Sequence, residues 1–367
     1  MIDTKSLFET ATLGSTTLNN RVAVSPMTRT SATPEGLATD QMASYYASFA
    51  RGGFGLIITE GTYIDDKYSQ AYVNQPGIAY DEQAQAWKNV VDSVHQEGAK
   101  IVMQLQHSGA LSQGNRFTRE TLAPSSIQPQ GEQLKMYSGE GSFKTPNEAT
   151  KAEVQEVIDG FVHAAERAQS VGFDGVEFHG ANGYLLDAFL TDYTNKRTDE
   201  YGGSLENRTR LLVEVSQAVR EAVGKEFIIG IRISQAKINN FAHKWTGKEH
   251  DADVIFRQLG QADYDYIHVT EYKAWEPAFD TNEAPLAALA KKYAGLPVIA
   301  NGHLEDPSHA EDMIANKEAD VIALGKGALA NHDWVNKVKH NEPLAAFEGE
   351  KVLNPNAKIK DFEVPGT

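Results

Sequence analysis

Strand-like and helix-like segments alternate along the chain from end to end. This alternation restricts the folds that the chain can adopt more than any other feature of the sequence. The strand-like segments are mostly continuous apolar runs, as expected of parallel strands that are buried on both faces. They lie at residues 21–25, 55–60, 100–105, 175–178, 227–233, 264–270, 296–300 and 319–324. Eight consecutive strand–helix units predict an α/β fold, the (β/α)8 TIM barrel. A doubly wound sheet is the alternative, but it rarely needs eight consecutive units.

Amphipathic segments with recognisable ends lie between the strands. Thr150 and Glu153 form a capping box before apolar residues at helical spacing, and a second such pattern ends at Gly224. Asp306 followed by Pro307 combines a cap with a first-turn proline, which predicts another helix start. Further helices are expected near residues 40–51, 82–98, 251–260, 284–293 and 328–338.

No repeat or low-complexity linker divides the chain, so residues 1–367 are interpreted as a single domain. Residues 11–20 predict an N-terminal hairpin that plugs the bottom of the barrel. Residues 106–150 form an insertion between the third strand and the third helix, for which we expect local strands or a lid. The tail, residues 340–367, is polar and carries no interpretable pattern.

Composition excludes several classes of protein. The absence of cysteine excludes disulfides, thiol nucleophiles, thiolate zinc sites and cysteine-ligated clusters. A net charge of −16 argues against nucleic acid or an anionic membrane as the partner, because both need a basic face. No apolar run approaches the ~20 residues of a membrane span, and the first residues lack a secretory signal pattern. We therefore expect a cytoplasmic protein that acts on a small molecule; its oligomeric state has no signature in the sequence.

The end of the fourth strand carries the most informative residues. His179, Asn182 and Tyr184 follow this strand within six residues, around an Asn182-Gly183 turn. In a (β/α)8 barrel the carboxyl ends of the strands form the active site. Each residue alone has a structural interpretation, but together they form a hydrogen-bonding pair beside a phenol that suits the binding and protonation of a polar substrate. The long polar segment that follows, up to Asn207, is typical of an ordered functional loop.

Other strand ends indicate an anionic ligand. Arg232 lies in the apolar strand I-I-G-I-R-I-S, where an arginine needs an anion; an ion pair inside the barrel is the alternative. Gln104 has a similar setting and is either a ligand-binding or a structural amide. The glycine turns at Gly302 and at Gly325-Lys326 follow strands seven and eight, which is the usual phosphate position of these barrels.

These residues belong to motifs that resemble the Old Yellow Enzyme family of NAD(P)H:flavin oxidoreductases. The segment H-x-x-N-G-Y-L-L at residues 179–186 is followed by N-K-R-T-D-E-Y-G-G-S-L-E-N-R at residues 195–208. The resemblance extends over nearly the whole chain. It includes N-R-V-A-V-S-P-M-T-R (20–29), T-E-G-T (59–62), Q-L-Q-H-S-G (104–109), I-R-I-S (231–234), A-N-G (300–302) and A-L-G-K (323–326).

The resemblance implies a noncovalently bound FMN, with NADH or NADPH as the reductant. It places the flavin ring and its phosphate against two groups of residues. The ring would contact Ser25, Pro26, Met27, Thr28, Gly61, Gln104 and Arg232, and the phosphate would contact Gly302, Gly325 and Lys326. In this family two half-reactions alternate: the nicotinamide reduces the flavin at N5 and leaves, and the hydride then passes to an alkene.

The resemblance also implies roles for the residues at the fourth strand. His179 and Asn182 would bind the carbonyl or nitro oxygen of an electron-poor alkene, such as an enone, a maleimide or a nitro compound, and polarise its double bond. Tyr184 would protonate the α-carbon. The implied activity is that of an ene-reductase.

Four positions depart from the common pattern of the family. Lys326 stands where arginine is common and keeps the charge without its bidentate fork. His303 replaces a frequent glycine, Gln106 replaces a common tryptophan, and Thr28 stands where some members have cysteine. These departures leave open a flavin-holding barrel without ene-reductase turnover. A metal-dependent barrel hydrolase is a further alternative, suggested by the strand-end histidines His107, His179, His268 and His303.

Overall fold

The computed structural model describes residues 4–281 and 283–364, and its centre is a closed barrel of parallel strands. The eight barrel strands are β3 (Val22–Val24), β4 (Leu56–Ile58), β6 (Lys100–Gln106), β9 (Gly175–Asn182), β10 (Ile228–Lys237), β11 (Tyr266–Thr270), β12 (Val298–Asn301) and β13 (Val321–Leu324). Each pairs in parallel with the next, and β13 pairs with β3, which closes the barrel. The predicted (β/α)8 barrel is confirmed.

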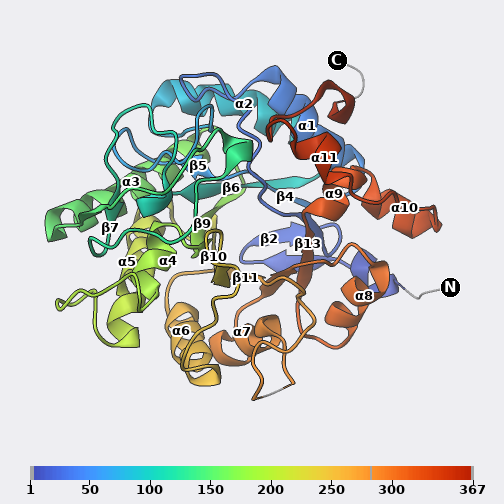
Figure 1. The fold of residues 1–367 in the computed structure, drawn as a ribbon. Helices are drawn as coiled ribbons and strands as arrows, with labels where there is room; N and C mark the ends of the chain where they lie inside the picture. The colour runs from blue at the N-terminus through green and yellow to red at the C-terminus, as the bar shows by residue number, and fades with distance from the viewer. Residues whose placement is uncertain (1–3, 282, 365–367) are drawn as a thin grey trace.

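Helices surround these strands (Figure 1). They are α1 (Asp40–Arg51), α2 (Asp81–Gln96), α3 (Lys151–Ser170), α5 (Leu205–Val223), α6 (Glu249–Gln261), α7 (Leu286–Ala294) and α8 (Pro307–Ala315). The predicted caps are present: the Thr150 hydroxyl accepts from the Glu153 N–H at 3.2 Å, and the Asp306 carboxylate accepts from the Ser308 N–H at 2.9 Å. The local end signals therefore determine where these helices begin.

The last predicted helix, residues 328–338, is instead two short helices, α9 (Lys326–Ala330) and α10 (Trp334–His340). Asn331 separates them with an extended backbone. Its amide group is paired with the backbone of Ala345, donating to the carbonyl and accepting from the N–H at 2.9 Å each. This contact with the tail competes with the continuation of the helix.

The predicted N-terminal hairpin is β1 (Ala11–Leu13) with β2 (Thr16–Leu18). Leu13 and Leu18 are fully buried and belong to the same apolar cluster as residues from the barrel interior, including Ile228 and Tyr266 at the starts of their strands. The hairpin therefore covers the amino-terminal end of the barrel and leaves the carboxyl ends of the strands free to form a site.

The insertion contains the predicted local strands, β7 (Leu122–Ala123) and β8 (Asn147–Glu148), which pair in parallel. The insertion also contains two short 3-10 segments, η2 (Gly109–Leu111) and η3 (Lys135–Tyr137). Outside it, the 3-10 segment η1 (Lys5–Phe8) precedes the N-terminal hairpin, and the short strand β5 (Thr62–Tyr63) follows β4 and pairs with β6.

The C-terminal tail folds back onto the chain just after β3. It contains α11 (Gly349–Leu353) and the short η4 (Asp361–Glu363). Arg29 and Glu363 form a buried ion pair with two hydrogen bonds of 2.7 and 2.6 Å, and Arg29 Nε also donates to the Ala357 carbonyl at 2.8 Å. The tail thus packs against Arg29, which directly follows the predicted flavin-ring residues Ser25 to Thr28.

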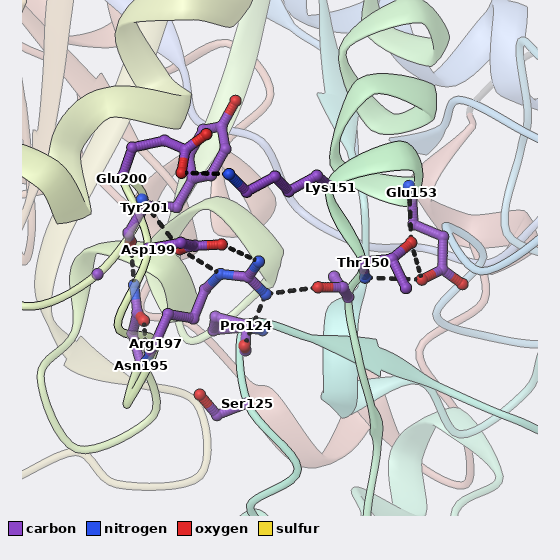
Figure 2. Close-up of polar contacts among 12 residues, drawn as sticks. Pro124, Ser125, Thr150, Lys151, Glu153, Asn195, Arg197, Asp199, Glu200 and Tyr201 are labelled. Atoms are coloured by element: carbon purple, nitrogen blue, oxygen red, sulfur yellow. Dashed lines mark hydrogen bonds and ion pairs between the residues drawn. The ribbon is translucent and has the colours of Figure 1, made fainter.

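The long polar segment after the fourth barrel strand begins with a helix, α4 (Leu185–Leu190), and then packs against the insertion (Figure 2). Arg197 donates to the carbonyl oxygens of Pro124 at 3.1 Å and Ala149 at 2.5 Å, and forms an ion pair with Asp199. The Lys196 N–H donates to the Ser125 hydroxyl at 2.9 Å. These contacts anchor the far end of the segment to the protein.

Within residues 4–281 and 283–364, no helix combines the length and the apolar character that a membrane crossing requires.

Candidate functional site

Three polar side chains lie side by side on neighbouring strands near the carboxyl end of the barrel. His179 of β9 is in register with Arg232 of β10, and Arg232 is in register with His268 of β11. Residues in register on parallel strands project to the same side of the sheet. One layer below, Glu177, Gly230 and Tyr266 are in register in the same way. The Tyr266 ring occupies the space that a side chain at Gly230 would fill, because a Cβ there would lie 2.0 Å from the ring.

Glu177 is the centre of a buried hydrogen-bond network in this lower layer. Its carboxylate accepts from Gln104 Nε2 at 2.9 Å and from the Tyr266 hydroxyl at 3.0 Å, and it pairs with His268 Nδ1 at 2.9 Å. Burial alone would raise the pKa of the Glu177 carboxyl, but His268, Arg232 and the Gln104 hydrogen bond outweigh it and hold the pKa below its usual range. A buried negative charge therefore lies under the row that contains Arg232.

Arg232 is buried and has no ion-pair partner within 4.0 Å among the residues that the structure describes. Its Nη2 donates to Asn301 Oδ1 at 2.7 Å, and its Nε has no hydrogen-bond partner in the described ranges. Burial lowers the pKa of the guanidinium to about 10, against the opposing effect of Glu177, so the group stays charged at neutral pH. The ion pair inside the barrel that was the alternative for this residue is not formed with any described residue.

His179 presents a neutral ring at the same level. Burial, reinforced by the charges of Arg232 and His268, holds the pKa of His179 well below its usual range. Its Nδ1 is buried without a hydrogen-bond partner in the described part of the chain. The centre of its ring lies 4.8 Å from that of Tyr184, so these two predicted site residues contact each other.

Asn182 and Tyr184 lie on either side of the predicted turn. Asn182 adopts a left-handed conformation with a φ of 63°, and its N–H donates to the Ser234 hydroxyl at 2.9 Å. The strand β9 continues to Asn182, four residues beyond the predicted end at Phe178. Tyr184 is the N-terminal cap residue of α4. The turn therefore places Asn182, His179 and Tyr184 on one short segment at the mouth of the barrel.

Tyr72 was missed by the sequence analysis and lies against Tyr184, with 2.5 Å between the two hydroxyl oxygens. Burial raises the pKa of Tyr184 to about 12, and the hydrogen bond with Tyr72 partly opposes this effect. Tyr184 is therefore protonated at neutral pH. The phenol of Tyr72 comes from a segment 112 residues away, and no local motif signals their contact.

The predicted flavin-ring residues frame the same mouth. The Ser25 N–H donates to the Leu324 carbonyl at 2.9 Å, which links β3 to β13. The Ser25 hydroxyl is buried and has no partner within residues 4–281 and 283–364. The sulfur of Met27 lies 3.6 Å from the position of a Cβ built on Gly325. A Cβ on Gly61 would lie 1.7 Å from Gln106 Oε1, so a side chain there would displace the Gln106 amide. Pro26 lies in the same stretch, and the Thr28 carbonyl accepts from the Tyr137 hydroxyl at 3.5 Å.

The predicted phosphate residues Gly302, Gly325 and Lys326 line one pocket of about 220 Å³. Gly302 has a φ of 141°, and a Cβ there would lie 2.0 Å from the Glu271 carbonyl oxygen, which explains the glycine. Lys326 is exposed and forms no ion pair with the described residues. The charged group and the open space fit an anion, and Asn301 connects this pocket to Arg232.

The residues present fit a bound flavin. Five buried polar groups near the carboxyl end of the barrel have no partner among the described residues: Ser25 Oγ, Gln106 Nε2, His179 Nδ1, Arg232 Nε and His268 Nε2. A buried polar atom without a partner costs free energy, so such a cluster indicates a ligand that supplies the missing hydrogen bonds. In contrast, no group of three or more His, Asp or Glu side chains in residues 4–281 and 283–364 could hold a metal ion.

Comparisons with known proteins agree with the motifs. The model of the NADH:flavin oxidoreductase / NADH oxidase family matches residues 6–345. An NADH oxidase from Thermoanaerobacter brockii is 32% identical over 345 residues, which cover 91% of this chain and 50% of that protein. An NADPH dehydrogenase from Clostridium acetobutylicum is 34% identical over 335 residues, which cover 90% of this chain and 93% of that protein.

A solved structure, that of the old yellow enzyme homologue from Zymomonas mobilis, matches this chain with a TM-score of 0.87 at 30% identity, and the match covers 98% of each chain. The relatives differ in length: this chain spans about half of the length of two of the curated relatives that it matches, at 50% and 49%.

Proposed function

This chain belongs to the Old Yellow Enzyme family of NADH:flavin oxidoreductases, whose cofactors are FMN and a nicotinamide, and on that premise we propose that it reduces electron-poor C=C bonds. The observation that carries the proposal is the pairing, in register, of a charged Arg232 with a neutral His179: among the described residues, Arg232 has no ion-pair partner and His179 Nδ1 has no hydrogen-bond partner. The first suits an electron-rich ring, and the second suits the oxygen of a substrate.

Arg232 and Gln104 would hold the pyrimidine edge of FMN. Because Gln104 Nε2 already donates to Glu177, its Oε1 is left to accept from a ring N–H. Arg232 would stabilise negative charge on the flavin, and its positive charge is itself supported by Glu177 beneath it. The chemistry that a bound FMN would supply is hydride transfer, from NADH or NADPH and then to the alkene, in a two-step, ping-pong cycle.

The remaining ring contacts and the phosphate would be provided by backbone and small side chains. Ser25, Pro26, Met27, Thr28 and Gly61 would line the ring. The phosphate would be held by Gly302, Gly325 and Lys326, in the pocket that these three residues line.

His179 and Asn182 would hold the carbonyl or nitro oxygen of the substrate. A neutral imidazole donates one hydrogen bond without the electrostatic cost of a second positive charge beside Arg232. Two donors on one oxygen draw electron density from the conjugated double bond and stabilise the negative charge that develops on that oxygen. Enones, maleimides and nitro compounds share this requirement.

Tyr184 would deliver the proton to the α-carbon. Its pKa of about 12 keeps the phenol protonated, and the Tyr72 hydroxyl at 2.5 Å can stabilise the oxygen once the proton has left. The small substrate would thus be bound through one oxygen by His179 and Asn182 and protonated at its α-carbon by Tyr184.

The first test is the colour and turnover of the purified protein. We expect a yellow protein that releases FMN on heating and consumes NADH or NADPH under anaerobic conditions when cyclohexenone, a maleimide or a nitroalkene is added. A protein that binds FMN but turns over none of these compounds would be a flavin-holding barrel, and a colourless protein that binds no added FMN would refute the cofactor.

A further inference from the structure

We propose that the buried ion pair between Lys237 and Asp187 is a positioning device that fixes the segment carrying Asn182 and Tyr184. Lys237 is the last residue of β10, and Asp187 lies in the first turn of α4. Neither residue belongs to the site inferred from the sequence. The inference rests on the proposed function for its consequence in catalysis, but the contacts themselves are properties of the protein alone.

The two charged groups are sequestered from water. The side chain of Lys237 is 1% exposed and that of Asp187 is 0% exposed. Lys237 Nζ donates to both carboxylate oxygens, at 2.6 and 2.7 Å. Removing two charges from water is costly, and replacement of such pairs by apolar residues is often neutral or stabilising. The pair is therefore weak evidence for stability, and its geometry points to a different role.

The Asp187 carboxylate reaches directly into the turn that carries the proposed oxygen-binding amide. Its Oδ2 accepts from the Gly183 N–H at 2.6 Å, next to Asn182. Gly183 has a φ of 90° and Asn182 a φ of 63°, so two consecutive residues are held in a conformation that most residues avoid. An Asn-Gly pair adopts this conformation at little cost, so the contact with Asp187 determines where the turn lies and not its shape.

Lys237 attaches this arrangement to the barrel wall. It is the register partner of Asn182 in the pairing of β10 with β9, and the next residue, Ile238, donates its N–H to the Asn182 carbonyl at 2.9 Å. The register shifts between Ile233 and Lys237, so regular pairing alone does not fix this end of the strands. The ion pair supplies a side-chain link from β10 to α4 at that point.

The two proposed substrate contacts lie on either side of the Gly183 N–H that Asp187 binds. Asn182 precedes it, and Tyr184 follows as the cap residue of α4. The far end of the segment is anchored separately by Arg197, which donates to the Pro124 carbonyl of the insertion (Figure 2). Loss of the ion pair should thus loosen the near end alone, where a displacement of about 1 Å can cost ~100-fold in rate.

The experiment compares Lys237→Met, and the double variant Asp187→Asn with Lys237→Met, with the wild-type holoenzyme. The double variant leaves no unpaired charge in the interior. The control is Lys151→Met, which removes the exposed Lys151–Glu200 ion pair at the anchored end of the same segment (Figure 2). Hydrogen exchange of the peptide covering residues 180–190 reports on the segment without any need for turnover.

We expect exchange at residues 183–187 to be at least about tenfold faster in both variants, and unchanged in the control. Binding of cyclohexanone, a non-reacting carbonyl probe, to the oxidised holoenzyme should weaken by about tenfold, while the FMN dissociation constant changes by less than about twofold. A double variant with wild-type exchange overturns the inference. So does an equal loss of FMN affinity and carbonyl affinity, because it indicates general destabilisation.

These outcomes are separate from those that test the proposed function. If the wild-type protein reduces no alkene, the ene-reductase proposal fails, whereas the exchange measurement still decides whether the ion pair fixes the segment. If the exchange rates change but carbonyl binding does not, the pair fixes the segment without positioning the substrate, and the inference is refuted in its functional part.

Discussion

Replacement of Tyr184 by phenylalanine should separate the two half-reactions of this protein. The change removes one hydroxyl oxygen and keeps the ring that contacts His179. Because the proton is needed only when the alkene is reduced, we expect reduction of the flavin by NADH or NADPH to change by less than about threefold. Reoxidation by cyclohexenone should slow by ~100-fold to ~10,000-fold, the usual worth of a positioned general acid.

The structure also bounds the side effects of this change. The Tyr72 hydroxyl loses its partner at 2.5 Å in a fully buried place. An unsatisfied buried hydroxyl costs about 1–3 kcal/mol, so the melting temperature should fall by a few degrees without loss of the fold. The variant should therefore keep its FMN and remain suitable for kinetics.

The assay is anaerobic stopped-flow absorbance of the flavin, with the two half-reactions measured in separate mixings. Tyr72→Phe is the matched control, because it removes the neighbouring hydroxyl and leaves the acid in place. We expect it to slow reoxidation less than Tyr184→Phe does. Equal losses in both half-reactions for Tyr184→Phe, or a larger loss in Tyr72→Phe, would refute the assignment of Tyr184 as the acid.

Three further predictions concern the phosphate, the tail and the effect of pH. Lys326→Ala should weaken FMN binding by about tenfold and Lys326→Arg should retain or tighten it, measured by the fluorescence of released FMN; equal affinities in all three proteins would exclude a role for this charge. Glu363→Gln leaves Arg29 buried and unpaired, so the free energy of unfolding measured in urea should fall by ~3 kcal/mol. A fall of less than ~1 kcal/mol would contradict a stabilising role for this ion pair. Burial lowers the pKa of His332 to about 4 in the folded protein, below its ordinary value. The neutral His332 side chain therefore contributes stability above pH 6.5, and this stability is lost as the pH falls towards 4, because the unfolded chain takes up the proton first. The free energy of unfolding lost over this pH range is ~3 kcal/mol, so in His332→Gln it should depend less steeply on pH below 6.5. The same pH dependence in the variant and the wild type would show that other groups cause the loss of stability in acid.

The barrel was predictable because its signals are local. Each buried parallel strand is a short apolar run, and most helices carry their own start or stop residue, as Thr150, Gly224 and Asp306 do. The errors occur where contacts distant in sequence decide the outcome. Strand β9 extends to Asn182 because its polar end still pairs with β10, although the apolar run stops at Phe178. The helix α4 is buried on every side and only six residues long, so it has no amphipathic periodicity to detect.

The tail shows the same limit more strongly. Its structure depends on Arg29 and Glu363, which are 334 residues apart in the sequence. Neither residue has an unusual neighbourhood, and the polar character of the tail gives no indication that Glu363 is buried. Only the folded barrel brings the two groups together.

For the site, the sequence predicted the residues that lie at strand ends, and not those that support them. His179, Asn182 and Tyr184 were found because they lie within six residues of one another. Tyr72 and Lys237 were not found, since each meets the site through a contact across many residues of sequence. The roles of all of these residues toward FMN and substrate remain predictions that the variants above can test.

The most direct test of the proposed activity is a single-turnover measurement on the wild-type protein. The FMN-loaded protein is reduced by one equivalent of NADH or NADPH without oxygen and then mixed with cyclohexenone, and the flavin spectrum and the organic product are followed together. We predict reoxidation that accelerates with cyclohexenone concentration and yields one cyclohexanone for each flavin. A flavin that bleaches but returns to the oxidised state no faster than in buffer, with no cyclohexanone formed, would contradict the proposal.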